Sequence, residues 1–80
     1  MTKKEWTDLF ETYVVLCETG SITKTADLLY KTQPAISARI QQLENELGCT
    51  LVHREKGKKN IILTPRGEAF LKTAQKFIEL

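Results

Sequence analysis

The sequence has few of the residues from which metal sites and catalytic centres are built. Its 80 residues include one histidine, His53, and two cysteines, Cys17 and Cys49. A zinc site needs about four ligands at suitable spacing, so this inventory argues against a resident metal. Ser21 and Ser37 have no histidine near them in the sequence, and there is no glycine-rich phosphate loop. We therefore expect neither an enzyme nor a cofactor-binding protein.

Long hydrophobic runs are absent as well. The apolar run VVLC is far shorter than the roughly 20 residues that a membrane-spanning helix needs, and it is too short for a signal peptide. We therefore expect a cytoplasmic protein, and a disulfide between Cys17 and Cys49 does not suit that reducing compartment. With 41% hydrophobic and 28% charged residues the composition is globular. A domain this small buries only about 60 to 65% of its unfolded surface, so a partner surface would help to stabilise it.

What the sequence does contain is a stretch from Ser21 to Gly48 that predicts two helices joined by a tight turn. Ser21 can cap a first helix of about two turns, because its hydroxyl can accept from an orphan amide. The second helix starts at the N-cap Thr32, with Pro34 in its first turn, where the missing N–H costs nothing. Its apolar residues recur at helical spacing: Ile36, Ile40, Leu43 and Leu47. Gly48 then ends it, and the whole is a helix-turn-helix.

The other face of the second helix is polar, and its N-terminal half has no acidic residue. On a helical wheel this face contains Pro34, Ser37, Ala38, Gln41, Gln42 and Asn45, with Arg39 at the margin. Small residues let a backbone approach a duplex, while hydroxyl, amide and guanidinium groups pair with base edges or phosphates. We interpret it as a face that enters a major groove. The alternative is a solvated helix face without a partner.

The segment after Gly48 predicts a β-hairpin. Two short apolar runs, Leu51–His53 and Ile61–Leu63, flank a loop of Lys, Gly and Asn. Its basic residues are Arg54, Lys56, Lys58 and Lys59. A protruding basic hairpin of this kind can lie along a minor groove, although it could also be simply a solvated loop.

The charge distribution supports a nucleic-acid partner more than the modest net charge of +2 does. From Lys24 to Arg66 there are eight basic and four acidic residues, whereas residues 1–23 have a net charge of −2. Positive charge therefore gathers around the helix-turn-helix and the predicted hairpin, as phosphate binding requires.

At these residues the sequence resembles the N-terminal domain of the LysR-type transcriptional regulators of bacteria. The resemblance spans nearly the whole chain and rests on Phe10 and on the segments GSITKTADLLYKTQPAISARIQQLENELG, LVHR and LTPRGEAFL. It implies a mainly α fold with a small β-hairpin, namely a winged helix-turn-helix with a three-helix core, a wing and a C-terminal linker helix. It also implies dimeric binding to double-stranded DNA, with Gln33, Pro34 and Ser37 at the groove and Arg54 in the wing.

The chain departs from the family pattern at two places. Members often have Arg directly after the serine of this motif, whereas here Ala38 comes first and Arg39 second. The wing loop, EKGKKNII, looks about two residues longer than is common, which is within ordinary hairpin-loop variation.

Two further helices complete the predicted fold. The first, from about Lys4 to Thr19, has apolar residues at helical spacing and serves as scaffold. The last begins after the N-cap Thr64 with Pro65, and Gly67 allows close packing. Its apolar residues form a surface too broad for one small domain to expose: Phe70, Leu71, Ala74, Phe77 and Ile78. We expect this surface to pack partly on the first helix and partly on a second copy.

We therefore divide the chain into a DNA-binding domain, residues 1–64, and a linker or dimerisation helix, residues 65–80. The apolar pattern still runs at the end, which suggests a fragment of a longer chain. The resemblance implies that an effector-sensing domain follows in the complete protein. A homodimer would place the helices of residues 32–47 in successive major grooves of a dyad-symmetric operator, with the wings of residues 51–63 near the minor groove.

Within that complex, Thr32 and Gln33 would bind phosphate, and Ser37, Arg39 and Gln41 would lie nearest the bases. The wing cations would add affinity with little sequence information. The full set of expected DNA contacts is Ser21, Thr23, Thr32, Gln33, Pro34, Ser37, Ala38, Arg39, Gln41, Arg54, Lys58 and Lys59. Two alternatives stay open: a DNA-binding domain of another regulator family with this fold, such as the molybdate-responsive regulators, and a winged-helix module that binds only proteins.

Overall fold

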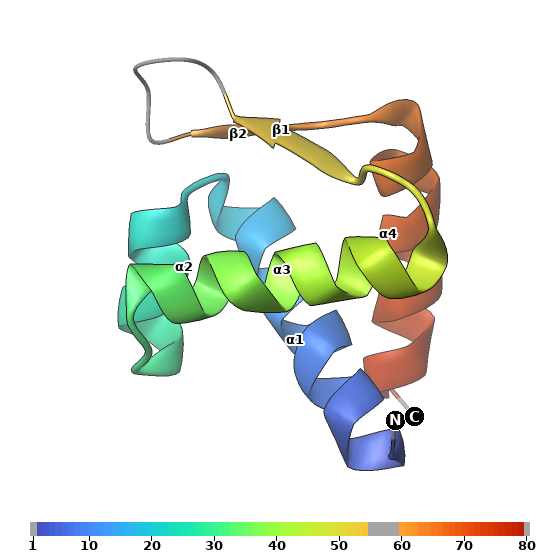
Figure 1. Ribbon diagram of the computed structural model, residues 1–80, viewed down its shortest axis with the longest axis horizontal. Helices are drawn as coiled ribbons and strands as arrows, with labels where there is room; N and C mark the ends of the chain where they lie inside the picture. The colour runs from blue at the N-terminus through green and yellow to red at the C-terminus, as the bar shows by residue number, and fades with distance from the viewer. Residues whose placement is uncertain (1, 55–59, 80) are drawn as a thin grey trace.

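Four helices and a two-stranded hairpin form the described part of the chain, residues 2–54 and 60–79 of the computed structural model (Figure 1). In chain order they are α1 (Lys3–Thr19), α2 (Ile22–Leu29), α3 (Gln33–Leu47), β1 (Val52–Arg54), β2 (Ile61–Leu63) and α4 (Pro65–Glu79). Figure 1 shows the hairpin above α3 and α4 beside the C-terminal end of α3. The predicted winged helix-turn-helix, mainly helical with one small hairpin, is confirmed.

Side-chain caps and glycines fix the ends of the helix-turn-helix. The Ser21 hydroxyl accepts from the backbone N–H of Lys24 at 3.2 Å, and the Thr32 hydroxyl accepts from that of Ala35 at 3.2 Å. Gly48 ends α3 in the left-handed region, with φ 70°. These three ends were predicted, because a cap is encoded by the residues next to it.

The hydrophobic core lies between α1 and the other three helices. Its buried apolar residues are Leu9, Phe10, Tyr13, Val14, Leu16, Ile22, Ala26, Ile36, Ile40, Leu43, Leu51 and Ala74. The stripe predicted for α3 is buried at Ile36, Ile40 and Leu43, and Leu47 packs half-buried at its end. Because this stripe faces the core, the opposite face of α3 is directed away from it.

The last helix, α4, packs on α1 through aromatic rings. The Phe10 ring lies edge-on to Phe70, with centroids 5.3 Å apart, and to Phe77, at 4.6 Å. The predicted packing of the last helix on the first is therefore confirmed.

Ala74, which we expected to face a second copy, is fully buried in this chain's own core. Its expected role at a dimer interface is wrong in this structure, because a residue with no exposed surface cannot contact a partner.

The start of α4 is fastened to the segment before β1. The Thr64 hydroxyl accepts from the N–H of Gly67 at 3.0 Å and donates to the carbonyl of Thr50 at 2.7 Å. A Cβ on Gly67 would lie 2.1 Å from the carbonyl oxygen of Leu51, so no side chain fits there. The Tyr13 hydroxyl donates to the Gly67 carbonyl at 2.6 Å. The predicted cap and the close packing at this glycine are both confirmed.

The hairpin pairs β1 and β2 in antiparallel register, with Val52 opposite Leu63 and Arg54 opposite Ile61. Leu51, which we expected to begin the first strand, is instead a fully buried core residue before it. The strand therefore begins one residue later than predicted and extends to Arg54.

The start of β2, at the loop end of the paired strands, is also bound to the turn between α1 and α2. Asn60 forms an isolated antiparallel bridge with Ser21, and the N–H of Ile61 donates to the Gly20 carbonyl at 3.0 Å. The wing is thus joined through backbone contacts to the residues that begin the helix-turn-helix.

Candidate nucleic-acid interface

The face of α3 that turns away from the core presents the side chains expected at a groove. Gln33, Pro34, Ala38 and Gln41 are exposed, and Ser37 between them is half-buried. The first turn of α3 has no acidic residue, so the partial positive charge of the helix N-terminus is not neutralised there. Thr32 and Gln33, which begin this helix and which we expect to contact phosphate, are exposed.

Glu44 is on the flank of this face, and its carboxylate is directed at backbone rather than at solvent. One oxygen accepts from the N–H of Leu51 at 2.7 Å and from that of Val52 at 3.2 Å. These contacts tie the negative charge to the segment that leads into β1. The sequence did not reveal them, because they join residues seven and eight positions apart across a change of direction.

The start of α2 offers fewer accessible groups for DNA contacts than expected. Ser21 caps α2 with its hydroxyl and is buried, so that hydroxyl is poorly accessible to a phosphate. Thr23 is half-buried, and among the described residues its hydroxyl oxygen is a buried side-chain atom without a hydrogen-bond partner. A buried polar atom without a partner is unfavourable unless a ligand or water satisfies it.

Arg39 does not point from the groove-facing side of α3. Its Nη1 donates to the hydroxyl of Thr12 on α1 at 3.2 Å, and Thr12 is fully buried. The side chain also lines a cavity of about 150 Å³ together with Glu5, Asp8, Leu9 and Gln42. Its expected place among the residues nearest the bases is therefore at odds with the structure. A residue at the margin of the apolar stripe can turn to either side, and here it braces α3 on α1.

Arg54 is on the opposite flank, at the end of β1. Its Nη2 donates to the Ser37 hydroxyl in the middle of the exposed face of α3. Together they line a cavity of about 220 Å³ whose other lining residues are Ile22, Ile40, Gln41, Glu44 and Val52. The sequence placed Arg54 in the wing but gave no sign of this contact. Lys58 and Lys59, the other expected wing contacts, lie outside the described residues.

The turn between α2 and α3 exposes an aromatic ring that the sequence analysis did not single out. Tyr30 is 94% exposed and has a left-handed backbone, with φ 55°. A bulky residue in this region is strained, so it usually marks a tight turn or a functional position. The N–H of the following residue, Lys31, donates to the Ala26 carbonyl at 2.9 Å and closes the turn. The ring thus stands just before the N-terminus of α3.

The buried Tyr13 and the half-buried Cys17 have raised pKa values, and both belong to the scaffold. Burial raises the pKa of Tyr13 far above its usual value. Burial also raises the pKa of the Cys17 thiol to about 11, although its hydrogen bond with Tyr13 acts in the opposite direction. Both groups are therefore neutral at physiological pH.

Within residues 2–54 and 60–79, no cluster of three or more His, Cys, Asp or Glu is suited to hold a metal ion.

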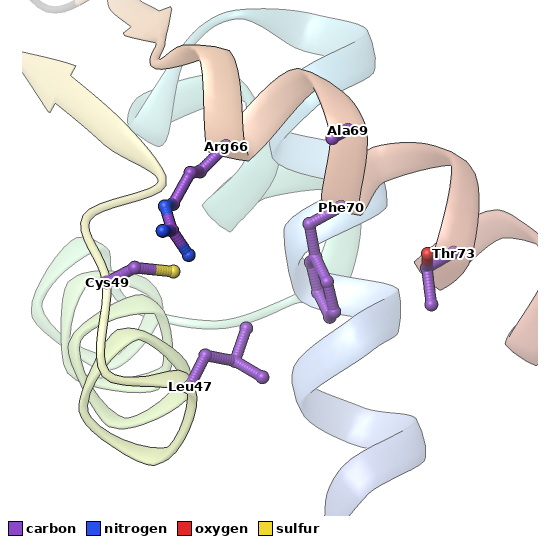
Figure 2. Close-up of a pocket in the computed structure, with 6 residues that line it drawn as sticks. All are labelled: Leu47, Cys49, Arg66, Ala69, Phe70 and Thr73. Carbon is purple, nitrogen blue, oxygen red and sulfur yellow. The ribbon is translucent and has the colours of Figure 1, made fainter.

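A third hollow lies between the end of α3 and α4, away from the N-terminus of α3. Figure 2 shows its lining residues: Leu47, Cys49, Arg66, Ala69, Phe70 and Thr73. Its volume is about 350 Å³. The guanidinium of Arg66 points toward Cys49 at one end, and Phe70 and Leu47 form an apolar wall. Of the residues expected to join two copies, only Phe70 lines it.

In the described part of the chain, no helix has the length and apolar character needed to cross a bilayer.

The pattern of the bacterial regulatory helix-turn-helix proteins of the lysR family matches residues 7–68. The chain belongs to the LysR family. This LysR-type domain is 44% identical over 69 residues to the HTH-type transcriptional regulator HdfR of Yersinia enterocolitica, and the match covers 86% of this chain and 23% of that protein. It is 42% identical over 69 residues to HdfR of Yersinia pestis, with the same coverage. The chain thus spans about a quarter of the length of these relatives.

Solved structures give the same assignment. The LysR-type domain is similar to the DNA-binding domain in the crystal structure of a CbnR–DNA complex, with a TM-score of 0.84, 30% identity, and coverage of 99% of this chain and 84% of that one. It is also similar to the DNA-binding domain of BenM in complex with catB site 1 DNA, with a TM-score of 0.81, 35% identity, and coverage of 99% and 78%. The chain is a LysR-type winged helix-turn-helix DNA-binding domain, as its sequence implied.

Proposed function

We propose that this LysR-type domain binds double-stranded DNA sequence-specifically as the DNA-reading part of a transcriptional regulator, with α3 in the major groove and the wing near the minor groove. The exposed face of α3 is the observation that carries the proposal. Its hydroxyl and amide groups are accessible, and the Glu44 carboxylate on its flank is hydrogen-bonded to backbone amides. The face therefore offers hydrogen bonds to bases without strong repulsion of phosphates.

The residues divide into three roles. Thr32 and Gln33, at the N-terminal end of α3, are suited to phosphate, whereas the buried hydroxyl of Thr23 would have to turn outward to reach one. Ser37, Ala38 and Gln41 would approach the base edges, with Pro34 packing against the backbone. Arg54, Lys58 and Lys59 would follow the DNA from the wing. Arg39 acts indirectly by fixing α3 to α1.

The assembly we propose is a homodimer on a dyad-symmetric operator, acting in the bacterial cytoplasm and without catalysis. Four α4 residues remain available for pairing, because each keeps part of its surface exposed: Phe70, Leu71, Phe77 and Ile78. A small-molecule effector would act only through a part of the regulator that this chain does not include. Relatives about four times as long leave room for such a part.

The test is selection of bound sites from a random duplex pool, followed by affinity measurements on the selected site and its single base-pair variants. We expect a palindromic sequence. Gln41→Ala should reduce discrimination at one or two base pairs by about 1–3 kcal/mol, because a base contact is lost. Thr7→Ala, on α1, should leave both affinity and preference unchanged. Equal binding of all sequences, with no enrichment, would favour a winged-helix module whose partner is a protein.

A further inference from the structure

A hydrogen bond between Arg54 of the wing and Ser37 of α3 restricts how the Ser37 hydroxyl can be oriented on the exposed face of α3. Arg54 is the last residue of β1 and is held in register opposite Ile61. From there its Nη2 reaches the hydroxyl of Ser37, which lies half-buried between the exposed residues Pro34 and Ala38. The contact joins the end of β1, next to the wing loop, to the centre of the face proposed to enter the major groove.

The chemistry of the pair fixes which partner donates. A guanidinium group carries only N–H donors and has no acceptor, so Ser37 Oγ is the acceptor. A hydroxyl has one proton, and its acceptance from Arg54 leaves that proton free to be donated elsewhere. Beside it, the Gln41 Nε2 donates to the Asn45 Oδ1 at 3.0 Å, which leaves the Gln41 carbonyl as an acceptor. The face thus presents a donor at Ser37 and, at Gln41, an acceptor together with the second N–H of the amide.

We propose that Arg54 is a positioning residue for base recognition, which holds Ser37 as a hydrogen-bond donor toward an acceptor on a major-groove base edge. The acceptors available there are purine N7, guanine O6 and thymine O4, whereas adenine N6 and cytosine N4 are donors and are disfavoured. This inference rests on the proposed function. It differs from the expectation that wing cations add affinity with little sequence information, because Arg54 would change which base is preferred.

The test is a double-mutant cycle on DNA binding, with Ser37→Ala, Arg54→Ala and the double variant measured against the selected site and its base-pair variants at fixed salt. We expect both single variants to lose preference at the same base pair. The double variant should lose little more than either single one, with a coupling of about threefold or more. At that base pair, the preferred base should offer an acceptor.

Two further variants separate positioning from charge. Arg54→Lys keeps the positive charge but loses the fork-shaped donor, so overall affinity should largely remain while preference falls. Arg66→Ala removes one cation from α4, outside the proposed interface, and should leave preference unchanged. Circular dichroism of each variant shows whether the fold is intact.

The inference is overturned if Arg54→Ala lowers affinity for every sequence by one factor, adds fully to Ser37→Ala, and reduces the slope of log affinity against log salt by about 0.9, as loss of a phosphate contact does. Arg54 would then serve only the DNA backbone. Failure of the wild-type domain to prefer any sequence is a different result, since it contradicts the proposed function itself.

Discussion

At the scale of single residues, Gly67 has the least room of the three glycines that the structure describes. A Cβ there would overlap the Leu51 carbonyl oxygen, 2.1 Å away, and touch the Tyr13 hydroxyl at 3.0 Å. We expect Gly67→Ala to lower the free energy of unfolding by about 3 kcal/mol, because α4 must move away from the segment before β1. Urea unfolding measures this.

Gly20→Ala is the matched control. Gly20 has φ +69°, but a Cβ there meets no atom within 4 Å. Only backbone strain is added, so the expected cost is about 1 kcal/mol. Equal losses for the two variants would show that crowding at Gly67 is relieved cheaply.

Tyr13 and Cys17 of α1, the first buried and the second half-buried, predict how stability depends on pH. The pKa of Cys17 is raised from its ordinary 9.0 to about 11, and that of Tyr13 is raised further, so the folded state holds both protons more tightly than the unfolded chain does. Their contribution is complete below about pH 9 and is lost as pH rises toward 11. The free energy of unfolding should therefore fall over this range.

Unfolding in urea at pH 7.5, 9 and 10.5 checks this dependence. A Tyr13→Phe, Cys17→Ala double variant should be less stable at neutral pH, but its stability should change less between pH 9 and 10.5. A wild-type domain that gains stability above pH 9 would contradict the burial of these groups.

At the scale of elements, α3 is held on both flanks. Arg39 joins it to Thr12 of α1, and Glu44 joins it to the backbone before β1. Arg39→Ala should lower the free energy of unfolding by about 1 kcal/mol and weaken binding to all DNA sequences alike, because the helix loses a brace and no base loses a partner. Glu46→Ala, an exposed change on the same helix, should stay within about 0.5 kcal/mol of wild type. If Arg39→Ala changed the preference among the single base-pair variants of the selected site, Arg39 would instead be a base-contacting residue.

What could be predicted from the sequence is limited by the range of the interactions. The caps at Ser21, Thr32 and Thr64 act over three residues, so the ends of the helices could be predicted. The partners of Arg39 and Arg54 could not, because they are 27 and 17 residues away in the chain and depend on how helices and wing are arranged. For the same reason the helical wheel of α3 identified its exposed face, but it could not show to which side the Arg39 side chain turns.

At the scale of the whole molecule, the apolar residues of α4 serve two purposes. Phe70 and Phe77 pack on Phe10 within the chain, whereas Ile78 is half-buried at the end of the helix. If α4 joins two copies, Ile78→Glu should shift the domain toward monomer in analytical ultracentrifugation while the fold persists. Ala74→Glu should instead unfold it, because a charge would enter the core.

Lys72→Glu, an exposed charge change on the same helix, is the control and should alter neither association nor folding. A wild-type domain that is monomeric at every concentration would place the pairing surface elsewhere in the regulator. Retention of the dimer by Ile78→Glu would exclude this end of α4 from the interface.

The backbone link between the wing and the α1–α2 turn, through Asn60 with Ser21 and Ile61 with Gly20, has a consequence for shape recognition. Because the start of β2 is bonded to the residues that begin the helix-turn-helix, the distance between the two DNA-contacting parts is set by the protein. A duplex must then match this fixed span or be deformed to meet it, at a cost that depends on its sequence. Base pairs that no side chain touches can therefore influence which sites are occupied, through how readily they allow the grooves to change width.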